Sequence, residues 1–574
     1  MTTTPIGTTA EGVPPPSRVP ELDKGLKSSA IGLVGSIVIA TASVAPAYSL
    51  AATLGLVVAA VGLQSPIIML LAFVPMLLIA FGYQGLNEID PDCGTTFTWG
   101  ARVFGPKTGW MGGWAIVVAD IIVMANLAQI AGGYGFQLVG ANGLANSAGW
   151  TEVAGVVWIV LMTVICYIGI EVSVNLQRAL LSIELVMLAL LSVVALVKVY
   201  GSNAPAGSIH ISASWFNPFD VPSFSALTSG LLLAVFIYWG WDTAVSVNEE
   251  TIDKTRTPGR SAVISTVLLL VTYGIVTVST QAFAGVGTTG TGLANPDNFG
   301  DVLSGLGGSV FGTAGLGWFL SKLLVLMVLT SASASTQTTI MPTARTALSM
   351  AGHKAIPAKF ARVHPKYQTP TWSTIGMGLA SVVFYVAFTK ISGNLLSDSI
   401  SSLGLAIAFY YGLTGLACFW YYIPLVRRGR RDGNTVWLKC ILPLVGALIL
   451  FAFFFYACHI FWDPNYGYTS WSMPFSPHWQ IGGVFLTGIG ALVIGIPLMY
   501  VQRFASPGYF RGETVPKFTA SRLEVTEPEA AAAAVGYQPI TGVESVEAPE
   551  AAESAGPDES PESSDAGEDT PPEQ

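Results

Sequence analysis

Four charged side chains lie within long apolar stretches of the sequence, where a charge is costly. They are Asp120, Glu184, Asp242 and Lys322. At the middle of a bilayer such a residue costs about 2.5–3.5 kcal/mol on insertion scales, and it usually faces a bundle interior or a transport pathway. Loss of water favours the neutral form of a carboxyl group, so Glu184 and Asp120 are candidate proton-coupling residues. The alternative is a protonated acid that bonds to a neighbouring helix, and Lys322 could extend toward the outer surface.

Two apolar stretches, 30–54 and 224–247, are the first and the sixth along the chain. Both are interrupted, and the interruptions predict a substrate site. The first contains Pro46, which removes an amide, clashes with the preceding turn and frees carbonyl groups around Ala42. The sixth contains Gly240 among aromatic residues, although either break alone could merely kink its helix. A half-helix that begins at a break directs N–H groups at an anion, and freed carbonyl groups accept from an ammonium, which suits an α-amino acid. The predicted substrate-binding residues are Thr41, Ala42, Ser43, Val44, Ala45, Tyr238, Trp239, Gly240, Trp241 and Asp242.

The elements that position these residues must be membrane helices. Of 574 residues, 52% are hydrophobic and only 11% are charged, whereas soluble domains carry roughly 25% charged residues. This composition excludes a soluble enzyme, a disordered protein and a nucleic-acid binder with a basic surface. The alternation of a lipid-facing β-barrel is absent, so we expect an all-α polytopic membrane protein. Twelve stretches are long enough to be transmembrane helices: 30–54, 66–86, 109–137, 153–170, 179–198, 224–247, 261–283, 316–341, 371–389, 400–423, 440–461 and 479–501.

The distribution of charge predicts the orientation and the ends of the chain. With twelve crossings, the segments on the side of the N-terminus hold 23 of the 26 Lys and Arg residues, which places both termini in the cytoplasm. The formal net charge of −9 comes from residues 523–574, which hold fourteen acids and no Lys or Arg. We expect 1–29 to be a disordered cytoplasmic arm, 30–504 to be the transporter domain and 505–574 to be a disordered acidic tail.

No cofactor or metal chemistry is indicated by the sequence. The 5 Cys and 5 His residues are scattered and form no CxxC pair, so neither a disulfide framework nor a metal site is expected. We recognise no phosphate-binding Gly-rich loop, no repeated pore loop and no catalytic constellation at membrane depth. An ATP-driven pump, a channel and a membrane-embedded enzyme are therefore disfavoured. No nucleic acid and no partner subunit is indicated.

Four local patterns are specific in combination. After the second stretch stands Asp90-Pro91-Asp92-Cys93-Gly94, followed by Phe104-Gly105-Pro106 and Gly109-Trp110. The sixth stretch has the order aromatic–Gly–aromatic–acid and continues to Glu249-Glu250-Thr251 and Pro258. The eighth stretch and the loop after it contain Arg345, Gly352, Ile356-Pro357, Phe360, Val363-His364-Pro365 and Thr369-Pro370. With the small residues of the first stretch, these patterns resemble those of the amino acid–polyamine–organocation permeases.

The resemblance implies a LeuT-type fold, in which 30–200 and 224–423 form a 5+5 inverted repeat and 440–501 adds two C-terminal helices. It also implies that Ser331, Ser333 and Ser335 lie where related folds place the wall of a cation site, although small hydroxyl residues also permit close helix packing. Glu184 falls where several family members carry a Lys near the sodium position of related transporters. Many members have Gly-x-Gly at the first break, where this chain has Thr41-Ala42-Ser43-Val44. Glu184 and the second acid, Asp120, together favour a cationic amino acid or an amine.

We therefore expect a secondary active transporter that imports amino acids or related amines across the plasma membrane. Its mechanism would be alternating access around broken helices 1 and 6, and its expected partners are the bilayer, the substrate and a proton. Sodium is the less favoured coupling ion. An amine or polyamine permease, or an amino acid exchanger in place of a symporter, is the alternative.

Overall fold

A computed structural model describes residues 22–518 except 203, 299–300, 428–432 and 476. Of the segments expected to be disordered, 1–29 and 505–574, the parts 1–21 and 519–574 lie outside these residues. Residues 22–29 and 505–518 are described, and 507–510 form the short helix α19. The side chain of Lys24 is only 2% exposed, because its ammonium lies against two carboxylates.

The chain before residue 201 folds into helices, as expected for apolar segments whose backbone groups must pair within lipid. Three helices of 25 residues or more, α3, α5 and α8, follow a first helix that is split in two. The elements are α1 (Leu33–Val44), α2 (Pro46–Val61), the 3-10 turn η1 (Gly62–Gln64), α3 (Ser65–Ile89), α4 (Thr96–Phe104), α5 (Pro106–Leu138), α6 (Asn142–Ala145), α7 (Ala148–Ile168) and α8 (Ile170–Tyr200).

The rest of the chain is also mainly helical. From residue 213 to 427 the elements are η2 (Ala213–Phe216), η3 (Pro218–Asp220), α9 (Phe224–Phe236), α10 (Thr243–Ser246), η4 (Asn248–Glu250), α11 (Thr257–Ala284), η5 (Pro296–Asn298), α12 (Val302–Phe311), α13 (Gly315–Gly352), η6 (Ala358–Ala361), α14 (Thr371–Ile391) and α15 (Gly393–Arg427). They are followed by α16 (Gly433–Val436), a π-helical turn η7 (Trp437–Ile441), α17 (Leu442–Phe461), β1 (Ser470–Ser472), β2 (Gln480–Gly482), α18 (Gly483–Ala505) and α19 (Pro507–Phe510).

Within the described part of the chain, ten helical runs are long and apolar enough to cross a membrane. The first run, Leu33–Ile89, contains two of the expected spans, and the shorter apolar helix Phe224–Phe236 lies in the expected span 224–247. Every expected span thus overlaps a helix, which confirms a polytopic, mainly helical membrane protein. The total of twelve crossings and the inverted repeat stay predictions.

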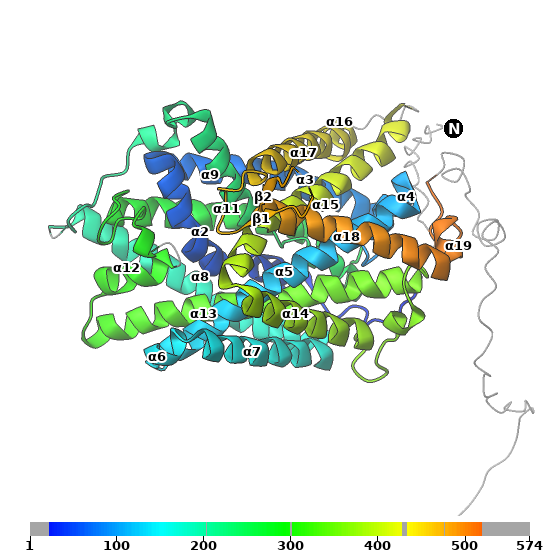
Figure 1. Cartoon of the computed structure of the whole chain (residues 1–574), viewed down its shortest axis with the longest axis horizontal. Helices are drawn as coiled ribbons and strands as arrows, with labels where there is room; N and C mark the ends of the chain where they lie inside the picture. The colour runs from blue at the N-terminus through cyan, green and yellow to red at the C-terminus, as the bar shows by residue number, and fades with distance from the viewer. Residues whose placement is uncertain (1–21, 203, 299–300, 428–432, 476, 519–574) are drawn as a thin grey trace, which may run out of the picture. The chain divides into compact units, whose positions relative to one another are not determined.

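The two interrupted helices lie at the centre of the bundle. α1 contacts α8, α10, α11 and α13, while α10 contacts α11 and α13. Figure 1 shows α7, α13 and α14 side by side along one side of the bundle, with α17 near the opposite side. Side chains from these central helices can therefore meet in the interior.

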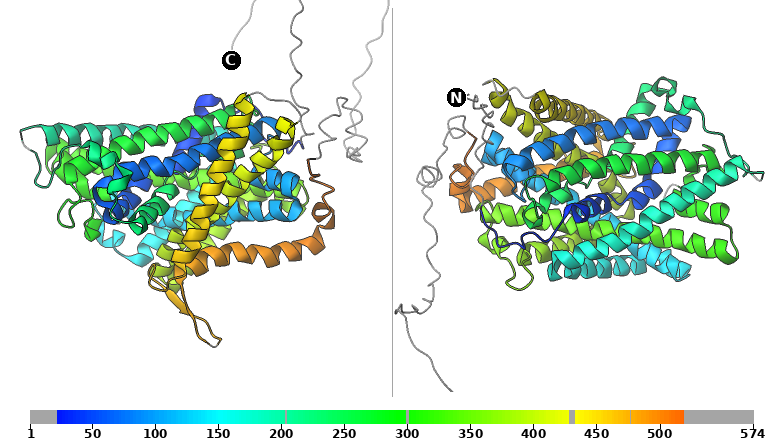
Figure 2. Two further views of the ribbon diagram at one scale, coloured as in Figure 1. Left: turned by 90° about the horizontal axis from the view of Figure 1, so that it is seen from above. Right: turned by 180° about the vertical axis from the view of Figure 1, so that it is seen from behind.

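A two-stranded hairpin between α17 and α18 departs from the all-α expectation. β1 and β2 pair antiparallel, with Trp471 opposite Ile481, and the hairpin projects from the helices in the left view of Figure 2. Asp398 of α15 is buried and accepts the backbone N–H groups of Tyr468 at 2.8 Å and Thr469 at 2.7 Å. These bonds fix the connection that leads into the hairpin.

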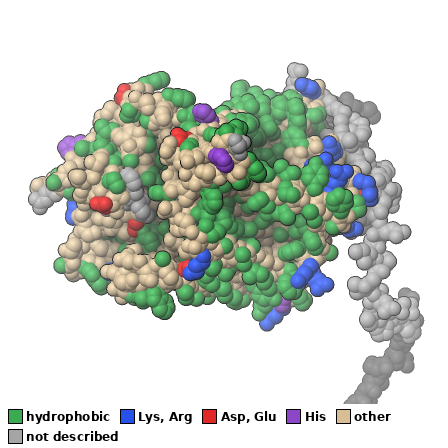
Figure 3. All heavy atoms as spheres, viewed as in Figure 1, with side chains coloured by type: hydrophobic (Ala, Val, Ile, Leu, Met, Phe, Trp, Pro, Cys, Tyr) green, Lys and Arg blue, Asp and Glu red, His purple; other side chains and the backbone are tan. Residues whose placement is uncertain are grey.

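The surface has the features expected of a helix bundle in lipid. α7 exposes a row of aliphatic side chains, and no soluble partner is needed to explain them if acyl chains cover that face. They are Val153, Val157, Val160 and Val164. Figure 3 shows Lys and Arg side chains gathered at the end of the bundle that carries α4 and α19. We call this end the terminal face.

Candidate functional site

The first expected break is present and lies at Ala45. α1 ends at Val44 and α2 begins at Pro46, while Ala45 has a left-handed backbone with φ 51° and ψ 66°. Pro46 opens α2, where a missing N–H costs nothing. The N–H of Ala45 donates to the carbonyl of Ala42 at 3.1 Å. Among the carbonyl groups that Pro46 was expected to free, the one of Ala42 is therefore used to close a tight turn.

The second expected break faces the first. Between α9 and α10, residues 237–242 form no α-helix, and Gly240 has φ 117°. A Cβ at Gly240 would lie only 2.9 Å from the carbonyl oxygen of Ser43, so a side chain there would both strain the backbone and collide. The hydroxyls of Ser43 and Thr243 are 2.8 Å apart. The breaks are thus in direct contact.

Glu184 of α8 lies at the start of α2. Its side chain is fully buried, and its Oε1 accepts the N–H of Ala47 at 2.6 Å and the hydroxyl of Ser331 at 2.7 Å. Its Oε2 has no hydrogen-bond partner in the described structure. One carboxyl group therefore joins α8, the second half of helix 1 and α13.

The three serines of α13 differ in what they contact. Ser331 binds Glu184 and also accepts the N–H of Tyr48 at 3.2 Å. Ser335 donates to the carbonyl of Ser43 at 2.9 Å. Ser333 donates to Leu329 within its own helix. Ser331 and Ser335 thus border the first break, whereas the bond of Ser333 does not reach it.

Asp242 forms a second acidic centre with two residues that sequence reasoning did not find. Tyr411 donates to its Oδ1 at 2.8 Å and Tyr410 to its Oδ2 at 3.2 Å, both from α15. Trp239 donates in turn to the hydroxyl of Tyr410. The only sequence signal was a Tyr pair within an apolar span, and its distance of 168 residues from Asp242 hides the contact.

Asp120 and Lys322 belong to other surroundings. Asp120 of α5 accepts a hydrogen bond from Thr343 of α13 and shares no hydrogen-bond partner with Glu184 in the described structure. Lys322 donates to the carbonyl of Gln137 at 3.2 Å, near the end of α5. The structure therefore does not unite the two predicted proton-coupling acids by a common bond.

The aromatic residues of the second break pack against other rings. Tyr238 meets Tyr273 with ring centroids 4.9 Å apart. Trp241 lies 5.2 Å from Tyr83 and 5.0 Å from Tyr411 by the same measure. All five rings are buried. They form a rigid lining on the side of the break that faces α3, α11 and α15.

The carboxyl groups of the three acids inside the bundle accept hydrogen bonds from neutral groups. Among the residues that the structure describes, no Lys, Arg or His forms an ion pair with Asp120, Glu184 or Asp242. Their partners are hydroxyls, phenols and one backbone N–H. Such a group binds a proton or an ammonium readily, because no built-in cation competes.

Comparison with known proteins identifies the family of this chain. The model of the family described as amino acid permease matches residues 28–486. The chain belongs to the amino acid permease family. The permease is accordingly a membrane transporter and not an enzyme.

Individual relatives are distant. An uncharacterized transporter of Mycobacterium tuberculosis is 25% identical over 363 residues, which are 63% of this chain and 71% of that protein. A branched-chain amino acid permease of Lactococcus lactis is 25% identical over 218 residues, or 35% and 44% of the two chains. A vacuolar cationic amino acid transporter of Arabidopsis thaliana is 24% identical over 362 residues, or 59% and 54%.

Proposed function

We propose that this permease imports amino acids or related amines across the plasma membrane, driven by a proton that binds at Glu184. The single observation that carries the proposal is the position of Glu184, whose Oε1 accepts from the first turn of α2 and from α13 at once. The relatives named for branched-chain and cationic amino acids support an amino acid as the substrate.

The coupling follows from the chemistry of the carboxyl group. As a carboxylate, Glu184 is a strong acceptor, and charge-assisted hydrogen bonds are roughly twice as strong as neutral ones. A proton on Oε2, which has no hydrogen-bond partner among the described residues, removes the negative charge and weakens both bonds of Oε1. The second half of helix 1 is then released from α8 and α13. Release and recapture of α2 would couple the proton to alternating access.

The sidedness of the protein is part of the proposal. Lys and Arg residues gather at the terminal face (Figure 3), which supports a cytoplasmic position for that face. Substrate would therefore enter at the opposite end and leave at the terminal face.

The test of the coupling ion is radiolabelled uptake into proteoliposomes under imposed gradients. An inward proton gradient should drive accumulation above the external concentration, and collapse of that gradient with a protonophore should abolish it. An equal sodium gradient without a pH difference should drive none. Accumulation driven by sodium alone would overturn the proton assignment. Equal flux with and without either gradient, but dependent on internal substrate, would identify an exchanger.

A second candidate, transport of an amine without a carboxylate, is favoured by the first turn of α2. Pro46 has no N–H, Ala47 donates to Glu184, Tyr48 donates to Ser331, and Ser49 donates to the carbonyl of Ala45. Every donor that could receive a substrate carboxylate there is already in use. The remaining chemistry of the breaks is acidic, which suits an ammonium.

Matched ligand pairs separate the two candidates. Leucine and 3-methylbutylamine, or lysine and cadaverine, differ only by the carboxylate. If the substrate is an amino acid, the amino acid of each pair should inhibit uptake of the radiolabelled substrate. It should also stabilise the purified protein against heat, and the amine should do neither. The reverse preference would assign the permease to amines.

A further inference from the structure

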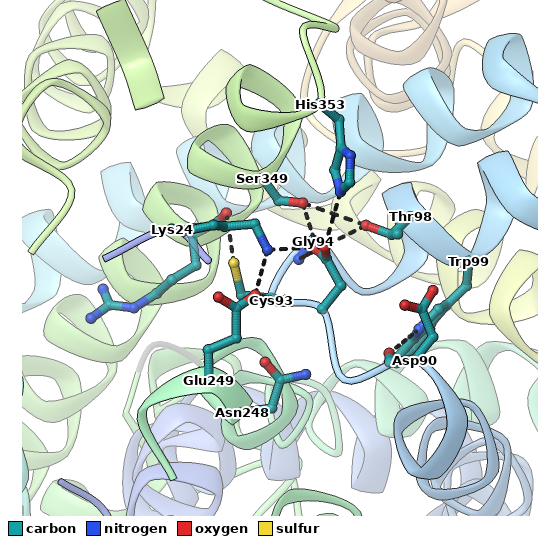
Figure 4. Close-up of polar contacts among 12 residues, drawn as sticks. Lys24, Asp90, Cys93, Gly94, Thr98, Trp99, Asn248, Glu249, Ser349 and His353 are labelled. Carbon is teal, nitrogen blue, oxygen red and sulfur yellow. Dashed lines mark hydrogen bonds and ion pairs between the residues drawn. The ribbon is translucent and has the colours of Figure 1, made fainter. Parts of the chain in front are cut away.

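A second charged cluster lies at the terminal face, away from the breaks. The side chain of Lys24 is 2% exposed, and its Nζ lies 2.9 Å from Oδ2 of Asp92 and 2.5 Å from Oε1 of Glu249. Figure 4 shows the ammonium of Lys24 directed toward Glu249. Lys24 precedes α1, Asp92 lies between α3 and α4, and Glu249 belongs to η4. One side chain thus joins three segments that are far apart in sequence.

Asp92 extends the cluster to α13. Its carboxylate also accepts the hydroxyl of Ser349 at 2.5 Å and lies 3.0 Å from Nε2 of His353, both at the end of α13. Within its own segment it accepts Thr98 at 2.9 Å and the N–H of Gly94 at 2.7 Å. Asp92 is therefore the centre to which α4, α13 and Lys24 are attached.

A backbone connection holds the N-terminal segment in the same place. The N–H groups of Ala30 and Ile31 donate to the carbonyl of Glu250 at 2.9 and 3.0 Å, and Ile252 donates back to Ile31 at 2.9 Å. The side chain of the same residue, Glu250, accepts two hydrogen bonds of 2.8 and 3.0 Å from Arg345 of α13. The N-terminal segment therefore lies directly on the junction of η4 and α13.

The electrostatics of the cluster favour the closed arrangement. Burial by itself would lower the pKa of Lys24, but Asp92 and Glu249 hold that pKa well above its usual range. Burial by itself would raise the pKa of Asp92, yet Lys24 and His353 hold it well below its usual range. A buried ion loses several kcal/mol of hydration, so the cluster is stable only while its charges stay together.

We propose that Lys24 is a latch that keeps the terminal face closed, and that its ammonium must leave Asp92 and Glu249 before this face can open. Alternating access requires the segments after broken helix 6 and before broken helix 1 to separate from α4 and α13 on one side. All of them meet at the ion pairs of Lys24 with Glu249 and with Asp92, which in turn holds α4 and α13. The latch rests on the proposed alternating access, but it does not depend on the substrate or on the coupled ion.

A metal ion is not needed to explain the cluster. Asp92, Cys93 and Glu249 have ligand atoms within 4.8 Å of one another. Lys24 already contacts both carboxylates, so the chain supplies the positive charge that a bound cation would bring.

Cys93 provides a native reporter of the latch. Its side chain is fully buried, and its N–H donates to Oε1 of Glu249 at 2.9 Å. In lipid nanodiscs, we expect Lys24→Met to speed modification of Cys93 by a hydrophilic maleimide at least about tenfold, which corresponds to about 1.4 kcal/mol. The rate is read for each cysteine by peptide mass spectrometry. Cys458 of α17, outside the cluster, is the internal reference, and its rate should not change.

Two further variants make the test specific. Lys27→Met removes an exposed ion pair with Glu171, whose atoms are 2.8 Å apart, and it should leave Cys93 protected. Glu249→Gln added to Lys24→Met should increase the rate little further, because both changes open one latch. Unchanged protection of Cys93 in Lys24→Met would overturn the proposal. So would equal exposure in Lys27→Met, or independent and multiplicative effects of Lys24 and Glu249. None of these results would bear on which ion drives uptake.

Discussion

The breaks at the bundle centre and the cluster at the terminal face both hold buried carboxylates, but they satisfy them in opposite ways. At the centre, Glu184 and Asp242 accept from a backbone N–H, a serine and two tyrosines. At the terminal face, Asp92 and Glu249 receive the ammonium of Lys24. In the first arrangement no protein cation neutralises the carboxyl groups, so a proton or a cationic ligand could do so. The second arrangement carries its own cation.

This difference separates a region suited to reversible binding of a cation from a region suited to holding helices together. A carboxylate held only by neutral donors can take up and release a proton or an ammonium without breaking a strong ion pair. A buried ion pair resists separation, because each partner would be left as an uncompensated charge. The carboxyl groups at the centre are thus suited to taking up and releasing a proton or an ammonium. The terminal face is suited to staying closed until several bonds break together.

Removal of one ion-pair partner at the terminal face should have the largest effect on stability. Arg345 and Glu250 are both almost fully buried, with 2% and 0% of their side chains exposed. Arg345→Met leaves Glu250 unpaired and should lower the free energy of unfolding by about 3–5 kcal/mol. Thermal unfolding in detergent measures it. Lys27→Met, which removes an ion pair with Glu171 whose side chains are 39% and 56% exposed, is the control and should have a small effect. Equal losses would remove the distinction between buried and exposed pairs.

A side chain at Gly240 should have the next largest effect, on transport. Gly240→Ala places a Cβ 2.9 Å from the carbonyl of Ser43 and requires φ 117° of an alanine. We expect the two breaks to separate and uptake to fall by at least about tenfold, the effect of about 1.4 kcal/mol. Gly274→Ala on α11, where a Cβ would meet no atom within 4 Å, should transport normally. Normal uptake by Gly240→Ala would show that contact between the breaks is not required.

Loss of a neutral hydrogen bond at the centre should cost much less. Ser335→Ala removes the bond to the carbonyl of Ser43, and hydrogen bonds between membrane helices contribute about 0.6 kcal/mol on average. Ser333→Ala, whose hydroxyl bonds within its own helix, should cost still less. The same unfolding measurement compares them with Arg345→Met. A loss at Ser335 as large as that at Arg345 would contradict the contrast between the two regions.

The pH dependence of the two regions should also differ. The pKa of Asp92 is held below its usual range, so its contribution to the latch is lost only as the pH falls through that lowered value. The pKa of Lys24 is held above its usual range, so its contribution is lost only as the pH rises through that raised value. Near neutral pH both stay ionised. Burial raises the pKa of Glu249, so its carboxylate is the first charge of the latch to be lost as the pH falls. The ratio of Cys93 labelling in Lys24→Met to that in the natural chain should therefore be constant near neutral pH and decrease in acidic buffers. Proton-driven uptake should change over the same range.

Much of the fold could be predicted, because a membrane helix depends mainly on the hydrophobicity of consecutive residues. The low charge and the apolar stretches predicted the helices, and Pro46 and Gly240 marked breaks that the structure places at Ala45 and at residues 237–242. These features follow from backbone chemistry within a few residues. The hairpin β1–β2 could not be predicted in this way, because it depends on bonds to Asp398 in a distant helix.

The partners at the site were less accessible to sequence reasoning. Glu184 was recognised because a charge in an apolar span is rare, whereas Tyr410 and Tyr411 are unremarkable until α15 lies against the second break. Lys24 was assigned to a disordered arm, since a polar, Pro-rich segment gives no sign of the two carboxylates that bury it. Long-range pairing of charges, and not helix formation, was the part that required the structure.

The most direct test of the central claim is proton-driven uptake by Glu184→Gln. The glutamine keeps the shape and the acceptor oxygen for Ala47 and Ser331 but cannot take up the proton. Glu152→Gln on α7, a buried acid paired with Lys390, is the matched control. We predict that Glu184→Gln loses accumulation driven by a pH gradient while it still binds substrate, and that Glu152→Gln accumulates normally. Full pH-driven accumulation by Glu184→Gln would contradict the claim that the centre moves the proton.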